Sequence, residues 1–165
     1  YAATKNINIL CENHGWLSSN PDALMAAIKE VNMKNCGTLP DFGGWCLEFD
    51  TEIRNTLYGR ARGKDAKNKN DKPLTIADAC KTLYDRYDGM KKILPFAKAV
   101  SAKSHVFDEK GENMTFSYKK MMKLVKDSGY KGFIGVEYSG MGGNISALEG
   151  IRLTKNLIIK YAKEI

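Results

Sequence analysis

The chain has 165 residues, of which 43% are hydrophobic and 27% are charged, so its length and composition are those of one globular domain and exclude a disordered chain. No run approaches the roughly 18 consecutive apolar residues of a membrane-spanning helix, and we expect no membrane partner. The net charge of +7 leaves room for a polyanionic partner.

The first half of the chain starts with a β-rich apolar run over residues 7–11. Asn20 and Pro21 then predict the start of a helix, because Asn is a favoured N-cap and Pro is tolerated in the first turn. A second short strand is expected over residues 36–42. Residues 43–74 are predicted to form a long, irregular and basic loop insertion.

The insertion carries much of the positive charge of the chain. Its basic residues are Arg54, Arg60, Arg62, Lys64, Lys67, Lys69 and Lys72. A surface for single-stranded nucleic acid needs aromatic residues interleaved with such charges, and only Tyr58 lies among them. We therefore interpret the insertion as a solvated loop and do not expect a nucleic-acid partner.

The second half of the chain continues the alternation of helix and strand. Its predicted elements are a helix over 76–90, a strand over 97–107, a polar turn over 108–113, a helix over 118–125, a strand over 131–140 and a helix over 151–165. Successive βα units predict a parallel sheet with right-handed crossovers. An open doubly wound sheet and a (βα)8 barrel both have this order, and the glycine-rich phosphate turn of dinucleotide-binding sheets is missing after every strand.

The cysteines give little support for a metal cluster or a disulfide framework. They are Cys11, Cys36, Cys46 and Cys80, and no pair has the CxxC spacing of zinc or iron–sulfur sites. Cys11 is predicted to be a small core residue. Reduced thiols favour a reducing, cytoplasmic compartment. The chain begins with Tyr1 rather than Met, so we expect that the natural N-terminus is absent.

Polar side chains lie at or near the end of each predicted strand. They are Glu12, Asn13 and His14 at the end of the first, Asp41 at the end of the second, Lys103, Ser104 and His105 towards the end of the third, and Glu137 in the fourth. The carboxyl ends of parallel strands form the ligand-binding face of both α/β architectures. Glu137 is expected in a strand buried on both faces, where a metal ion would remove the cost of an unpaired carboxylate. Carboxylates with one imidazole predict a divalent cation, with Mn²⁺ or Mg²⁺ favoured and Co²⁺ or Zn²⁺ possible.

Four stretches together carry a resemblance to a known family: "ENHG", "GTLPDFG", "FAKAVSAKSHVFD" and "GYKGFIGVEYSG". They resemble the sugar phosphate isomerase/epimerase superfamily, the xylose isomerase-like TIM barrels, over residues 7 to about 160. The resemblance implies that residues 1–165 are one domain, the C-terminal half of a TIM (βα)8 barrel. The missing N-terminal half-barrel, or a second copy of this chain, would then be a partner.

The resemblance also implies a divalent metal at the mouth of the barrel. Its ligands would be Glu12, Asp41, a residue of the third strand and Glu137. The family has a histidine where this chain has Ser101, and strand alternation places residues 101, 103 and 105 on one face, so His105 is the predicted replacement. The alternative is a solvent-facing His105 with water at the fourth position. Relatives often carry Asn or His where this chain has Gly44, which suggests a lost substrate contact.

The function implied is that of a metal-dependent sugar or sugar phosphate isomerase or epimerase that works through an enediolate. The predicted catalytic residues are Glu12, Glu137 and Lys103, and the predicted substrate-binding residues are His14, Trp16, Trp45 and Ser101. A lyase or dehydratase acting on keto-sugars or keto-glycosides would use the same chemistry. An abasic-site endonuclease would need many more histidines than His14 and His105, and a non-catalytic half-barrel is a further alternative, since this half alone could lack activity.

Overall fold

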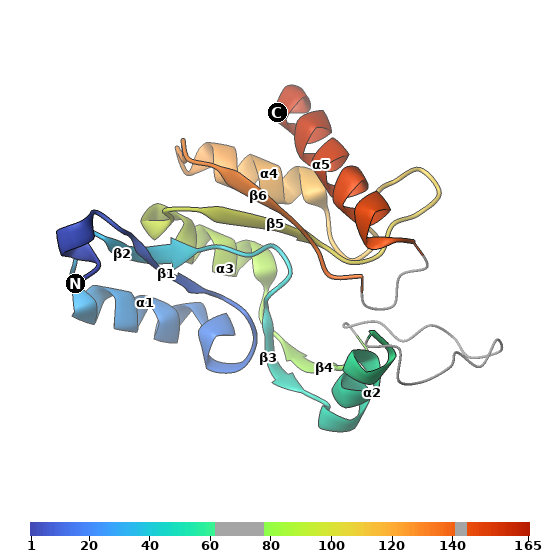
Figure 1. Cartoon of the computed structure of the whole chain (residues 1–165), viewed down its shortest axis with the longest axis horizontal. Helices are drawn as coiled ribbons and strands as arrows, with labels where there is room; N and C mark the ends of the chain where they lie inside the picture. Colours follow the sequence, from blue (N-terminus) through green and yellow to red (C-terminus); the bar gives the residue numbers. More distant parts are fainter. Residues whose placement is uncertain (62–77, 141–144) are drawn as a thin grey trace.

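The computed structural model describes residues 1–61, 78–140 and 145–165. Parallel strands form its centre, and they are β1 (Ile9–Glu12), β2 (Cys36–Leu39), β5 (Val100–Ser104) and β6 (Ile134–Tyr138). β1 pairs with β2 and β5 pairs with β6. Parallel bridges from Thr38 to Ala97 and from Asp41 to Ser101 join β2 to β5, which gives the order β1-β2-β5-β6 (Figure 1).

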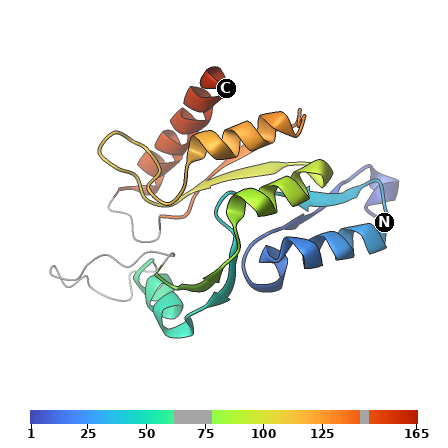
Figure 2. The same cartoon turned by 180° about the vertical axis from the view of Figure 1, so that it is seen from behind.

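A helix follows each of these strands before the next one begins. The helices are α1 (Pro21–Val31), α3 (Arg86–Ile93), α4 (Tyr118–Asp127) and α5 (Ala147–Glu164), with short 3₁₀ turns η1 (Ala3–Lys5), η2 (Trp16–Ser19) and η3 (Leu94–Phe96). Contacts join α1 to α3, α3 to α4 and α4 to α5, so the helices form a row in the same order as the strands (Figure 2). The predicted βα succession is therefore confirmed, and strands and helices follow one another in the consecutive order that a barrel segment has.

Side-chain caps explain where the helices begin. The Asn20 side chain accepts hydrogen bonds from the backbone N–H groups of Asp22 and Ala23, as its sequence position predicted. Asp85, Ser117 and Ser146 cap α3, α4 and α5 in the same way. The polar turn over 108–113 is also confirmed, because Asp108 accepts from the backbone of Lys110 and Glu112.

The core lies between the sheet and the row of helices. It includes Leu24 and Ile28 of α1, Met90 and Ile93 of α3, Val100 and Ala102 of β5, and Met121 and Val125 of α4. Strand alternation places Val100 and Ala102 in this core, and it leaves Ser101 and Lys103 for the other face of β5. One face of β5 thus packs against the core, and the other carries polar side chains.

The segment predicted as an irregular insertion contains regular structure. Strand β3 (Cys46–Phe49) pairs antiparallel with β4 (Cys80–Leu83), and α2 (Thr51–Ala61) follows β3. We call β3, α2 and β4 the insertion lobe (Figure 1). The rest of the predicted loop, residues 62–74, lies outside the described residues.

Two further expectations are wrong in this lobe. Residues 80–83 form a strand rather than the first turns of a helix over 76–90, because pairing with β3 outweighs the local apolar spacing. Cys46 and Cys80 form a disulfide, so the expectation of reduced thiols fails for this pair and the cysteines no longer support a reducing compartment.

The outer strands β1 and β6 are exposed on their far sides. Ile9 of β1 is 53% exposed and Phe133, just before β6, is 92% exposed. Cys11 is exposed rather than part of the core, and Glu137 is half-buried rather than enclosed on both faces. The expected burial of Cys11 and Glu137 assumed that a further strand pairs with the outer edge of β1 and of β6. Within the described residues, β1 and β6 each pair with one neighbouring strand. Among the described helices, none has the length and hydropathy of a bilayer span.

Trp45 fixes the insertion lobe to α3, and this contact can be tested. A Cβ atom on Gly89 would lie 2.0 Å from the Trp45 indole. Gly→Ala inside a helix normally stabilises by about 1 kcal/mol. We expect Gly89→Ala instead to lower the free energy of unfolding by about 1–3 kcal/mol, because the ring fills the space.

Urea denaturation measures this change in stability. Lys91→Ala, at an exposed position of the same helix, is the control and should change the value by less than about 0.5 kcal/mol. A Gly89→Ala protein as stable as the parent would contradict the packing of Trp45 against α3.

Candidate functional site

Three carboxylates meet at the carboxyl ends of the parallel strands. Glu12 ends β1, Asp41 follows β2 and Glu137 lies in β6, and each offers an oxygen within 4.8 Å of the others. Segments far apart in the sequence are brought together because parallel strands end at one edge of the sheet. The structure thus unites three of the four residues predicted as metal ligands.

Asp41 is the most buried member of this group. Its Oδ1 accepts a hydrogen bond of 2.9 Å from the Gly43 N–H and lies 3.7 Å from the Lys103 ammonium. Its Oδ2 is buried and has no hydrogen-bond partner in the part of the chain that the structure describes. Burial raises the pKa of Asp41 from 3.8 to about 7, although the charge of Lys103 opposes this.

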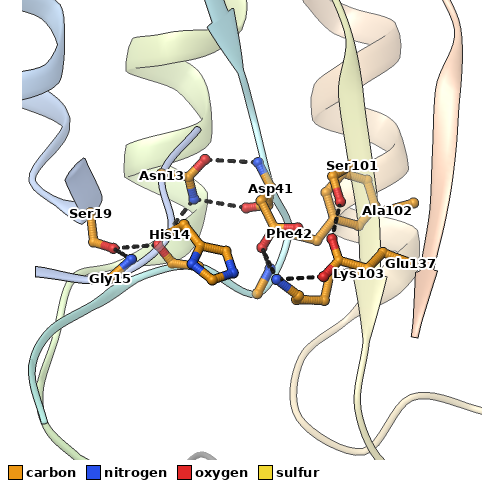
Figure 3. A network of polar contacts seen from close by, with 12 residues as sticks. Asn13, His14, Gly15, Ser19, Asp41, Phe42, Ser101, Ala102, Lys103 and Glu137 are labelled. Carbon is orange, nitrogen blue, oxygen red and sulfur yellow. Dashed lines mark hydrogen bonds and ion pairs between the residues drawn. The ribbon is translucent and has the colours of Figure 1, made fainter. Parts of the chain in front are cut away.

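Asn13 holds the backbone on which Asp41 is presented. Its fully buried amide donates to the carbonyl oxygens of Asp41, at 2.9 Å, and Gly44, at 3.1 Å. Its Oδ1 accepts from the Asp41 N–H at 2.7 Å (Figure 3). The sequence analysis placed Asn13 at a strand end without a role. The structure shows that its side chain fixes the backbone of residues 41–44, the loop that follows β2.

Gly44 is explained by the same close approach. A Cβ atom at this position would lie 1.7 Å from the Asn13 carbonyl oxygen. A larger residue would push the loop away from Asn13 and break the hydrogen bonds that hold Asp41. Packing therefore requires the glycine in this chain, and the lost substrate contact stays a prediction.

Glu137 is held by two side chains of β5. The Lys103 ammonium lies 2.8 Å from its Oε1, and the Ser101 hydroxyl donates to its Oε2 at 2.8 Å (Figure 3). Burial pushes the pKa of Glu137 upward, but the hydrogen bond and charge of Lys103 outweigh it, so the net pKa is below its usual value. Burial lowers the pKa of Lys103, but the Asp41 and Glu137 carboxylates outweigh it, so the net pKa is above its usual value.

The charges of this group match a divalent cation. Three ionised carboxylates and one ammonium leave a net charge of −2, which an ion of charge +2 would cancel. The available donors are carboxylate oxygens, which Mg²⁺ and Mn²⁺ prefer. The buried Asp41 Oδ2 offers an open position for such an ion. Glu12, Asp41 and Glu137 therefore fit a divalent metal.

The structure does not bring His105, the fourth predicted ligand, into the carboxylate group. His105 follows β5, which ends at Ser104, and it is buried, so the alternative of a solvent-facing His105 is wrong. His105 is buried under Gly43, where an added Cβ atom would lie 2.7 Å from its Nε2. Burial, with Lys103 and Arg86 nearby, lowers its pKa to about 4.

The predicted substrate-binding residues lie in different environments. Ser101 lies within the cluster, where it orients Glu137. His14 is exposed beside the centre, and its charge helps to lower the pKa of Glu137. Trp45 is fully buried against Tyr84, so it is a core residue and not a wall of the site. Trp16 is 51% exposed and contacts the insertion lobe.

Arg86 is a residue near the site that the sequence analysis missed. Its guanidinium donates to the Phe42 carbonyl at 3.3 Å and stacks on Phe116 at 4.6 Å. Its charge acts on both Asp41 and His105. The incorrect helix over 76–90 placed Arg86 in the middle of a helix, whereas α3 begins at this residue, and its contacts come from segments distant in sequence.

Comparison with known proteins identifies one matching family. Residues 1–157 match a family model described as xylose isomerase-like TIM barrel. No curated protein matches the chain.

Asp41 and His105 predict opposing effects of pH on stability in metal-free protein. The folded-state pKa of Asp41 is raised to about 7, so its stabilisation is lost as the pH rises through that value. The folded-state pKa of His105 is lowered to about 4, so its stabilisation is present above 6.5 and lost as the pH falls. The two effects largely cancel between about pH 4 and 6.5.

Single variants should separate these effects. Between pH 4.5 and 6.5 the free energy of unfolding should rise with pH in Asp41→Asn and fall with pH in His105→Gln, by at most about 1.4 kcal/mol per pH unit. Urea denaturation with a chelator present measures both slopes. Identical pH profiles for the parent and both variants would contradict these environments.

Proposed function

Because this chain belongs to the xylose isomerase-like TIM barrel family, we propose that it carries half of the active site of a metal-dependent isomerase or epimerase of a keto-sugar or its phosphate. The observation that carries the proposal is the convergence of Glu12, Asp41 and Glu137 around the Lys103 ammonium at the carboxyl ends of the strands. This arrangement combines proton carriers, a permanent positive charge and a set of oxygen donors.

The side-chain carboxylates of Glu12, Asp41 and Glu137 would hold the metal ion. A divalent ion bound there would supply Lewis-acid polarisation of a substrate carbonyl. Asn13 and Gly43 would keep Asp41 in place, and Ser101 would keep Glu137 in place. Such outer contacts matter in metal sites because they orient the ligands before the ion arrives.

Glu12 and Glu137 are the proposed proton carriers. One carboxylate takes the proton from the carbon next to the carbonyl, and the electron pair moves to the carbonyl oxygen to give an enediolate. Return of the proton to the former carbonyl carbon, together with transfer of the neighbouring hydroxyl proton to the former carbonyl oxygen, completes an isomerisation. Return to the opposite face of the same carbon, from the other carboxylate, completes an epimerisation.

Lys103 and His14 would stabilise and orient the substrate. The raised pKa of Lys103 keeps its ammonium charged, so it can donate a hydrogen bond to the enediolate oxygen. His14, exposed beside Glu137, would bind a substrate hydroxyl. A β-elimination from the same enediolate would make the enzyme a lyase or dehydratase.

The geometry gives less support to an endonuclease of the abasic-site type. A cluster of zinc ions needs several histidines, and no histidine joins the carboxylates among the residues described. We therefore keep the keto-sugar reaction as the proposed function.

Hydrogen exchange tests the reaction. With Mn²⁺ present in D₂O, we expect deuterium to enter a ketose from a substrate panel, at C1 or C2 for an isomerase and at C3 for a 3-epimerase. Glu137→Gln should slow exchange by about 100-fold or more because a proton carrier is lost. Asp127→Asn, an exposed carboxylate in a surface ion pair, is the matched control and should exchange at the parental rate.

Mass spectrometry and NMR measure the amount and position of deuterium. Exchange that is equally fast in the parent and in Glu137→Gln would contradict the assigned role. Absence of exchange with every ketose, in protein shown to be folded and assembled, would contradict the function.

We also propose that further strands, from the rest of a longer chain or from a second copy, cover the exposed edges of β1 and β6. Exposed Ile9 and Phe133 support this, since bare edges and apolar side chains favour pairing. The 165-residue chain alone should self-associate in sedimentation runs. Ile9→Lys on the β1 edge should weaken association.

The matched control is Ile159→Lys, which places the same charge at an exposed position of α5. It should associate like the parent. A stable monomer of the parent at all concentrations would contradict the pairing of these edges.

A further inference from the structure

We propose that Trp16 and Phe49, backed by Arg54, form a binding shelf for a second sugar ring beside the candidate metal centre. The proposal rests on the proposed function for the identity of the first ring, which would be the keto-sugar held at the carboxylates. The substrate class would then be a keto-glycoside with at least two rings. We call Trp16, Phe49 and Arg54 the aromatic shelf.

The shelf is built from two parts of the fold. Trp16 belongs to η2, directly after β1, whereas Phe49 and Arg54 belong to β3 and α2 of the insertion lobe. The Trp16 and Phe49 rings lie 5.2 Å apart in an edge-to-face arrangement. The Arg54 guanidinium lies 4.5 Å from the centre of the Trp16 ring and 5.5 Å from that of Phe49.

The shelf lies next to the carboxylates along the chain. Trp16 comes four residues after Glu12, so their Cα atoms are at most about 14 Å apart. A Cβ atom on Gly15 would lie 2.9 Å from Phe49, which places the phenyl ring against the turn that carries His14. A ligand that reaches from the carboxylates past His14 would meet these rings next.

The turn that carries Trp16 is held firmly in an unusual conformation. Gly15 has φ 100° and Trp16 has φ 51°, a left-handed conformation that a tryptophan seldom adopts. Ser18 accepts from the His14 N–H and donates to the Gly15 carbonyl, and Ser19 accepts from the Gly15 N–H and donates to the Gly44 carbonyl. Backbone strain of this kind is concentrated at binding and catalytic sites.

Trp16 is too exposed to be a residue that only fills the core. Trp45 is fully buried, as expected for a tryptophan that fills the core, whereas 51% of Trp16 remains exposed. A sugar ring has an apolar C–H face that can lie on an indole. The shelf offers the exposed indole of Trp16 for this contact, with the Arg54 guanidinium against both rings.

The disulfide explains how Phe49 is kept in place. Phe49 pairs with Cys80 in the β3–β4 ladder, and Cys80 is bonded to Cys46 at the other end of β3. The insertion lobe would thus act as a specificity element, since it adds an aromatic surface to the turn after β1.

Tryptophan fluorescence gives a direct test because the chain has two tryptophans and Trp45 is buried. Quenching by acrylamide therefore reports on Trp16. With Mn²⁺ present, lactulose, a keto-disaccharide, should reduce the quenching constant about twofold or more, and fructose, a single-ring ketose, should change it little.

Calorimetric titration of the same protein tests the contribution of each ring. Trp16→Phe and Phe49→Ala should weaken lactulose binding about fivefold, so that lactulose loses the affinity that its second ring adds over fructose in the parent. Leu17→Ala is the control, because Leu17 lies in the same turn, is 75% exposed and is not part of the shelf. It should bind both sugars like the parent.

The outcomes separate this inference from the proposed function. Mn²⁺ and fructose binding with no added protection or affinity from lactulose would overturn the shelf and leave the proposed function standing. Protection of Trp16 by lactulose without Mn²⁺ binding or exchange would support the shelf and count against the proposed function. Protection of Trp16 by a peptide library and not by lactulose would also overturn the shelf, since the occupant would then be a protein segment.

Discussion

The candidate centre depends on one constraint, which is that the Asp41 carboxylate is fully buried and its backbone is fixed by Asn13. Asn13 donates to the Asp41 and Gly44 carbonyls and accepts from the Asp41 N–H, so the loop after β2 has one well-defined course. The bridge between Asp41 and Ser101 joins β2 to β5 at the same place. One of the two bridges that join β2 to β5 therefore lies at the residue that faces the other carboxylates.

The electrostatics of the site follow from this burial. A carboxylate in such a place must be neutralised by a proton, an ammonium group or a metal ion. The structure provides Lys103 between Asp41 and Glu137, and one oxygen of Asp41 is left without a partner among the described residues. Ser101 and Gly43 complete the support of the two carboxylates. The same groups that stabilise the ionised cluster would prepare it for a divalent ion and for negative charge on a substrate.

Sequence patterns predicted the features that depend on local rules. The helix start at Asn20, the alternation of βα units and the polar strand ends at Glu12, Asp41 and Glu137 all follow from propensity, capping and the geometry of parallel strands. Features that depend on distant contacts were missed. The β3–β4 pairing and the Cys46–Cys80 bond join residues 34 apart in sequence, and local apolar spacing suggested a helix there instead. The absence of His105 from the carboxylate group and the burial of Trp45 against Gly89 of a later helix also depend on distant contacts.

Calorimetric titration of the metal-free protein with Mn²⁺ at pH 6, in two buffers of different ionisation enthalpy, tests the central claim most directly. Because the pKa of buried Asp41 is about 7 without metal, most molecules carry its proton at this pH. The account predicts that each chain binds a single ion and releases close to one proton as it does so. Binding without proton release, or no binding at all, would contradict the claim that Asp41 is a buried carboxylate prepared for a divalent cation.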